Sequence, residues 1–116
     1  IPLPFASTNN LRSFLYIDDC VEATLKLFNS NHHGPINIGS EEKVSINEMI
    51  DKIEIISKKK VKRNYQLDKP TGVRGRNSDN TLIRQLLNWE PKFSLHQGLE
   101  KTYEWIFSEV KKKHNQ

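Results

Sequence analysis

The sequence contains a single cysteine, Cys20, which excludes both a framework of disulfide bonds and a cysteine-rich zinc site. So sparse a use of cysteine fits a reducing compartment, and we expect the protein in the cytoplasm. No run of apolar residues approaches the roughly 20 that a membrane span requires, so a transmembrane protein is also excluded. Residues 1–5 (IPLPF) carry neither a charged leader nor an initiator methionine, so we expect the chain to derive from something longer.

Complete catalytic motifs are missing as well. The sequence has no P-loop, no glycine fingerprint for a dinucleotide after a strand, and no metalloprotease pattern. Asp18 and Asp19 could form a metal pair or act as acid and base, but their position at the start of a predicted helix favours capping. His32 and His33 have no further ligands at metal-binding spacing. We therefore predict no catalytic residue and no metal site within this chain.

The charge of the chain is unevenly distributed. Its 116 residues are 35% apolar and 28% charged, which is enough for one modest core, and the formal net charge is +4. Residues 1–60 contain seven Lys or Arg and eight Asp or Glu, whereas residues 61–116 contain eleven and six. The basic second half indicates an anionic partner, which could be nucleic acid, an anionic membrane surface or a small phosphorylated ligand.

Alternating β-prone and helical segments predict an α/β fold with short parallel strands. We expect a loop over residues 1–11 and strands over residues 13–17, 35–40 and 61–67. Helices are expected over residues 18–28, 45–57, 78–88 and 94–110. Three short strands make a poor sheet alone, so we expect their neighbours to lie upstream.

Capping and burial can also be predicted for these helices. Ser45 with Glu48, and Ser94 with Gln97, have the spacing of capping boxes. Burial through one face is predicted for the last two helices, and both tryptophans are expected in the core. These positions are Leu82, Ile83, Leu86, Leu87, Trp89, Leu95, Leu99, Tyr103, Trp105, Ile106 and Val110.

The most informative segment is residues 69–80, in which Arg74 and Arg76 alternate with glycines just before a predicted helix. Glycine lets a backbone approach a ligand closely, arginine binds phosphate through two donors, and a helix N-terminus offers unpaired N–H groups. Together these features could form a clamp for a diphosphate. On spacing alone, however, a solvated basic loop is the simpler interpretation. Arg12 is likewise either a second phosphate contact or an ordinary surface arginine.

Motifs along nearly the whole chain point to a known family. Residues 12–22 (RSFLYIDDCVE) look like a strand-helix junction, and residues 35–48 like the strand and helix that follow it. Residues 73–80 (VRGRNSDN) are the most specific motif, followed by residues 87–91 (LNWEP) and 98–99 (GL). The set resembles the NAD-dependent epimerase/dehydratase family, which are extended short-chain dehydrogenases/reductases, and above all the C-terminal end of its GDP-mannose 3,5-epimerases.

The resemblance implies that residues 1–116 form the C-terminal, substrate-binding portion of a Rossmann-type enzyme. The family's NAD loop and its Tyr-x-x-x-Lys catalytic pair belong upstream, so the chain alone is expected to be inactive. Tyr65 and Lys69 share that spacing, but no helix or serine partner precedes them, and we assign them no role. The implied cofactor is NAD, bound by the upstream portion. The implied partners are that portion, a nucleotide-diphosphate sugar expected to be GDP-mannose, and a second copy in a homodimer.

Site residues also follow from the resemblance. Arg76 matches the family arginine that binds the diphosphate of the GDP-sugar, and Arg12 matches an arginine near the same phosphates. Asn77 and Ser78 are further candidates for this pocket. The family chemistry is transient oxidation of sugar C4 by NAD, proton exchange at C3 and C5 by upstream bases, and re-reduction. Cys20 is not the catalytic cysteine of the family, which also lies upstream.

Three alternatives stay open. The same region of a UDP-glucuronate decarboxylase or a nucleotide-sugar dehydratase would share several motifs, although residues 73–80 favour the epimerase. A non-catalytic basic module for nucleic acid would explain the charge, but no nucleic-acid motif occurs and the aromatic residues are expected in the core. A non-catalytic remnant or subunit of a split gene is the third.

Overall fold

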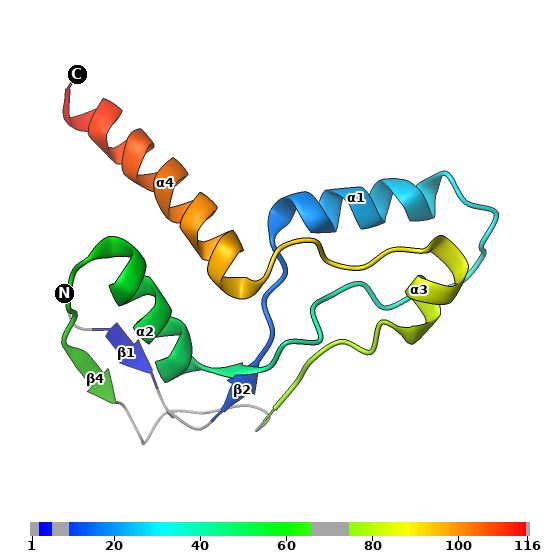
Figure 1. Ribbon diagram of the computed structural model, residues 1–116, viewed down its shortest axis with the longest axis horizontal. Helices are drawn as coiled ribbons and strands as arrows, with labels where there is room; N and C mark the ends of the chain where they lie inside the picture. The colour runs from blue at the N-terminus through cyan, green and yellow to red at the C-terminus, as the bar shows by residue number, and fades with distance from the viewer. Residues whose placement is uncertain (1–2, 6–9, 66–74, 116) are drawn as a thin grey trace.

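The computed structural model describes residues 3–5, 10–65 and 75–115 of the chain. The strands are β1 (Leu3–Phe5), β2 (Leu11–Arg12), β3 (Val44–Ser45) and β4 (Arg63–Tyr65). The helices are α1 (Ile17–Phe28), α2 (Ile46–Ser57), α3 (Thr81–Leu87) and α4 (Leu95–His114). Figure 1 shows α1 and α3 on one side of the molecule and α2 with β1 and β4 on the other. Helix α4 begins between these groups, contacts α2 and then extends outward.

The sheet structure among the described residues consists of two short pairs of strands. β1 pairs with β4 in parallel, with Leu3 opposite Arg63, as expected for an α/β fold. β2 pairs with β3 in the antiparallel sense, with Leu11 opposite Ser45, which differs from the parallel pairing that we predicted. Isolated pairs of this length are only marginally stable, so helix packing and loop hydrogen bonds must hold the remaining segments.

Two of the three predicted strands are wrong. Residues 13–16 form no strand and α1 already begins at Ile17, while residues 35–40 are irregular. Their peptide groups serve other contacts, since the Tyr16 carbonyl accepts from Cys20 N–H and the Ser40 carbonyl from Ser78 N–H. The third predicted strand is confirmed at residues 63–65, which form β4, whereas residues 61–62 are not part of a strand. The expected loop at residues 1–11 is also wrong where it contains β1 and the start of β2.

The two predicted caps lie where they were expected. The Ser45 hydroxyl accepts from Glu48 N–H at the start of α2, at 3.1 Å. A full capping box opens α4, because Ser94 and Gln97 exchange bonds through their side chains and backbone N–H groups. These caps satisfy N–H groups that a helix leaves unpaired, which explains why local sequence predicted both helix starts well.

Asp19 has a different role from the predicted cap. The N-cap of α1 is Tyr16, and no side chain caps this helix. Asp19 lies in the first turn but is 1% exposed, and its two oxygens accept from the N–H groups of Lys92 and Phe93 at 3.0 and 3.1 Å. The carboxylate thus joins α1 to the segment that leads into α4, a link between residues far apart in the sequence.

The main core cluster joins α1 and α3. Ala23, Ile83 and Trp89 are buried there, with four half-buried neighbours: Leu15, Ile36, Ile38 and Leu87. The core position predicted for Trp89 is confirmed, whereas Trp105 is 64% exposed because α4 extends beyond the packed part of the molecule. The burial predicted along the outer faces of α3 and α4 is wrong for four other residues: Leu82, Leu86, Ile106 and Val110.

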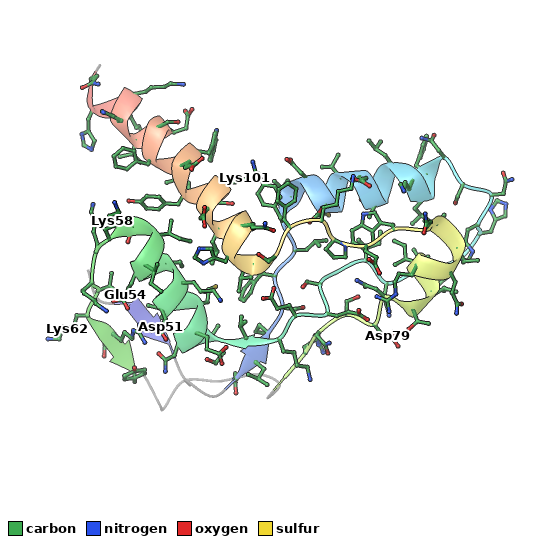
Figure 2. The ribbon with its side chains drawn as sticks, viewed as in Figure 1. Asp51, Glu54, Lys58, Lys62, Asp79 and Lys101 are labelled. Carbon is green, nitrogen blue, oxygen red and sulfur yellow. The ribbon has the colours of Figure 1, made fainter. Side chains whose placement is uncertain are left out.

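Polar contacts attach β4 to α2. The Arg63 guanidinium donates to Asp51 at 2.6 Å and to Glu54 at 2.7 Å, and Figure 2 labels these two carboxylates on α2. Val61 N–H also donates to Glu54, at 3.0 Å, and this bond together with Arg63 lowers the pKa of that carboxyl group. None of the helices in the described residues combines the length and apolar character that crossing a bilayer demands.

Candidate functional site

Three segments that are distant in the sequence meet beside β2. Leu11 forms a parallel bridge with Gly75, and its carbonyl accepts from Arg76 N–H at 3.1 Å. Ser78 N–H donates to the Ser40 carbonyl, also at 3.1 Å. A cavity of about 460 Å³ lies between these segments, and its lining contains both polar and apolar residues. The lining residues are Ser13, Leu15, Asn37, Ile38, Gly39, Ser40, Arg76, Asn77 and Ser78.

The structure places three of the four predicted site residues in this lining, namely Arg76, Asn77 and Ser78. Arg12 is not among the lining residues, but it lies next to them. Its Nη1 donates to the Leu11 carbonyl at 2.8 Å, and this is the carbonyl that accepts from Arg76 N–H. The guanidinium of Arg12 therefore lies beside the backbone of Arg76.

Arg76 has the side chain best suited to hold an anion. It is exposed, and within residues 3–5, 10–65 and 75–115 its guanidinium makes no hydrogen bond or ion pair. A guanidinium presents a planar set of N–H donors that matches two phosphate oxygens. The described residues that line the cavity include no carboxylate, histidine or cysteine. These residues can therefore bind and orient an anionic group, but none of them is a general base.

The side chains of Asn77 and Ser78 already serve the loop itself. The Asn77 amide donates to the Glu41 carbonyl at 3.1 Å, and the Ser78 hydroxyl donates to Asn80 Oδ1 at 2.6 Å. An amide nitrogen has two hydrogens and a hydroxyl has one. Asn77 therefore keeps one donor for a ligand, while Ser78 would have to give up its bond to Asn80 to donate to one.

Asn80 is a buried anchor that sequence reasoning missed. It is 0% exposed, its amide donates to the Gly39 carbonyl at 2.8 Å, and its own N–H donates to Glu41 at 3.1 Å. Asn80 stands at the N-cap position of α3, but its side chain makes no cap bond. No local pattern could have linked residues 39–41 to residues 77–80, because the contact depends on tertiary packing. Asn80 thus fixes the wall that carries Arg76.

Gly39 allows the close approach of the two walls of the cavity. A Cβ atom built on Gly39 would lie 2.7 Å from Ser78 Cβ, closer than real Cβ contacts, whereas a Cβ on Gly75 would meet only ordinary contacts. We expect Gly39→Ala to push residues 75–80 outward and to weaken phosphate-ligand binding by about tenfold, while Gly75→Ala binds normally. Calorimetric titration of both variants with the phosphate ligand checks this. Equal affinities of the two variants would contradict the claim that Gly39 is needed for the close approach.

Glu41 makes the stability of this site sensitive to acid. Its hydrogen bond to Arg84 and its bond from Asn80 N–H lower the pKa of the carboxyl group below its ordinary value. The pKa of Glu41 is lower in the folded chain than in the unfolded one. This stabilisation is therefore fully present above the unfolded-state pKa and disappears as the pH falls through the folded-state pKa. We expect Glu41→Gln to flatten the acid side of a plot of melting temperature against pH. The exposed Glu104→Gln variant should reproduce the unmodified curve.

Other sequence candidates receive no support as a site. Within the part of the chain that the structure describes, no three His, Cys, Asp or Glu side chains gather as metal ligands would. Cys20 is half-buried on α1. Arg74 and Lys69 lie outside the described residues, so the predicted arginine pair of the glycine-rich loop is represented here by Arg76 alone.

Comparison with known proteins identifies similar chains. Residues 2–102 match the family model described as GDP-mannose 4,6 dehydratase. The chain is 46% identical over 101 residues to GDP-mannose 3,5-epimerase of Arabidopsis thaliana. This match covers 87% of this chain and 26% of that protein. The chain thus spans about a quarter of the length of this relative.

Solved structures agree with this similarity. UDP-glucuronic acid 4-epimerase from Bacillus cereus, in complex with UDP-glucuronic acid and NAD, superposes with a TM-score of 0.82 at 32% identity. The match covers 92% of this chain and 35% of that one. UDP-glucose 4-epimerase from Thermotoga maritima, solved with UDP-glucose, gives the same TM-score at 26% identity and covers 95% and 35%.

Proposed function

Since the chain belongs to the GDP-mannose 4,6-dehydratase family of nucleotide-sugar epimerases and dehydratases, we propose that it forms the nucleotide-sugar-binding part of a GDP-mannose 3,5-epimerase. The observation that carries the proposal is the cavity in which Arg76, Asn77 and Ser78 lie together, with Arg12 alongside. The 46% identity to an epimerase of that name supports GDP-mannose as the ligand.

The chain's own residues would bind and orient the ligand. The Arg76 guanidinium holds the diphosphate through two donors, and Arg12 adds a second cation from the adjacent strand. Asn77 contributes its remaining amide donor. Asn80 and Glu41 act indirectly, since they hold residues 77–80 against residues 39–41. A fixed diphosphate places the sugar at a constant distance from these walls, which is the positioning that catalysis requires.

NAD has no evident place in this chain. A dinucleotide requires a glycine-rich loop between a strand and a helix N-terminus, and the sequence contains no such fingerprint. We therefore assign NAD, which supplies oxidation and re-reduction of the sugar in this family, to the part of a family member that lies outside this chain. By the same reasoning we expect the chain alone to be inactive. Separately, we place the assembled enzyme in the cytoplasm.

A chimera tests this function. The matching 101 residues of the Arabidopsis thaliana epimerase are replaced by the corresponding residues of this chain. We expect the chimera to convert GDP-mannose to its 3,5-epimerised product, and the present chain by itself to show no turnover. A chimera that folds and binds NAD but does not bind GDP-mannose would contradict the proposal.

A further inference from the structure

Two irregular segments beside the candidate site run next to each other in opposite directions. At one point of contact the Asn77 amide donates to the Glu41 carbonyl at 3.1 Å. Two positions further along, a Cβ atom built on Gly75 would lie 3.9 Å from Lys43 Nζ. The ammonium group of Lys43 therefore lies beside the residue that directly precedes Arg76.

The three consecutive charged residues of the first segment have different surroundings. Glu41 pairs with Arg84 of α3 at 2.7 Å, and Glu42 accepts from Leu95 N–H at the start of α4 at 3.0 Å. Lys43 is exposed, and within residues 3–5, 10–65 and 75–115 its side chain makes no hydrogen bond or ion pair. Both neighbouring carboxylates thus have partners in other elements, and neither forms an ion pair with Lys43.

Lys43 adds a third positive charge to this part of the molecule. Val44, the next residue in the chain, pairs with Arg12 across β2 and β3. The N–H of Arg76 donates to the carbonyl of Leu11, which is the other residue of β2. Three cationic residues thus lie on three adjacent segments. Charges of one sign that gather in this way create a local potential that attracts anions.

We propose that Lys43 is a further ligand-binding residue, whose ammonium group holds the diphosphate of the nucleotide sugar together with Arg76. The proposal rests on the proposed function for the identity of the ligand. Lysine carries its charge on a flexible chain of four carbons, so an exposed lysine can turn toward a phosphate that a planar guanidinium already binds. Two linked phosphates offer enough oxygens for both cations. They also give Lys43 the anionic partner that it lacks among the described residues.

Calorimetric titration of the chimera with GDP-mannose, and separately with inorganic pyrophosphate, tests the role of Lys43. Lys43→Gln should weaken the binding of both ligands by about fivefold, the effect expected of one exposed ion pair. Lys43→Arg keeps the charge and should bind both ligands as the unmodified chimera does. Because salt screens exposed charges, the difference between Lys43→Gln and the unmodified chimera should shrink as the ionic strength rises.

Lys62→Gln is the matched control. Lys62 is also exposed and loses the same charge, but it lies beside β4 and away from β2 (Figure 2). Its substitution should change neither affinity. The proposal is overturned if Lys43→Gln binds both ligands as well as Lys62→Gln does. It is also overturned if Lys43→Arg binds as weakly as Lys43→Gln, because the charge is then not the cause.

Failure of this proposal and failure of the proposed function give different results. Equal binding of GDP-mannose by Lys43→Gln and by the unmodified chimera overturns the role of Lys43 and leaves the function intact. A chimera that binds pyrophosphate but not GDP-mannose contradicts the function, and a fivefold loss of pyrophosphate affinity in Lys43→Gln would then still support the role of Lys43. A folded chimera that binds neither ligand overturns both.

Discussion

Replacing Arg76 by alanine in the chimera is expected to weaken GDP-mannose binding by about 100-fold while NAD binding stays unchanged. Each hydrogen bond to a charged group contributes about 1.5–3 kcal/mol, and the guanidinium can offer two to a diphosphate. Tenfold in affinity corresponds to about 1.4 kcal/mol, so losing both bonds at the lower end of this range, about 3 kcal/mol together, accounts for the predicted factor. Calorimetric titration with GDP-mannose, and separately with NAD, measures the two affinities.

Two variants sharpen this prediction. Arg76→Lys keeps the charge but not the planar pair of donors, so its affinity should fall between those of alanine and arginine. Lys113→Ala removes the same charge from the end of α4, far from the cavity, and should leave the affinity unaltered. If Arg76→Ala and Lys113→Ala weaken binding equally, the cavity holds no specific diphosphate contact and only the overall charge matters.

Asp19→Ala is expected to destabilise the fold by about 3 kcal/mol. The substitution leaves two part-buried backbone N–H groups, those of Lys92 and Phe93, without the carboxylate that now accepts from both. Hydrogen bonds to charged groups are worth about 1.5–3 kcal/mol each, and a buried unsatisfied donor adds its own desolvation cost. The segment that leads into α4 would lose its attachment to α1. Urea unfolding of the chimera measures the change in free energy.

Asp18→Ala is the matched control for this prediction. Asp18 lies in the same helical turn and is exposed, so its loss removes only a favourable charge near the helix N-terminus, worth about 0.3–1 kcal/mol. Asp19→Asn should be intermediate, since an amide oxygen can replace only one of the two acceptors. Equal effects of Asp18→Ala and Asp19→Ala would show that Asp19 contributes only through the helix dipole.

Local patterns in the sequence predicted the helices better than the strands. Ser45 and Ser94 cap α2 and α4 because capping depends on neighbours three residues apart, which a sequence displays directly. The strands at 13–17 and 35–40 were predicted from composition, but a strand exists only where another strand lies beside it, and none does there among the described residues. Trp105 was assigned to the core by periodicity, which cannot reveal whether a covering partner is present.

The candidate site was only partly visible in the sequence. On spacing alone the arginine and glycine pattern favoured a solvated basic loop. The family resemblance indicated Arg76, Arg12, Asn77 and Ser78 as site residues. Asn80, Gly39 and Glu41 could not be recognised, because their importance lies in contacts between residues about 40 positions apart. Asp19 was misread for the same reason, since its acceptor role depends on residues that follow α3.

The measurement that tests the central claim most directly is calorimetric titration of GDP-mannose into the chain together with the complementary part of the Arabidopsis thaliana epimerase. GDP and UDP-glucose serve as controls, and the chain alone is titrated in parallel. We predict binding of GDP-mannose to the mixture, weaker binding of UDP-glucose, and loss of binding with Arg76→Ala. Absence of binding in a mixture whose two pieces are folded and associated would contradict the claim that Arg76 holds the diphosphate of a nucleotide sugar.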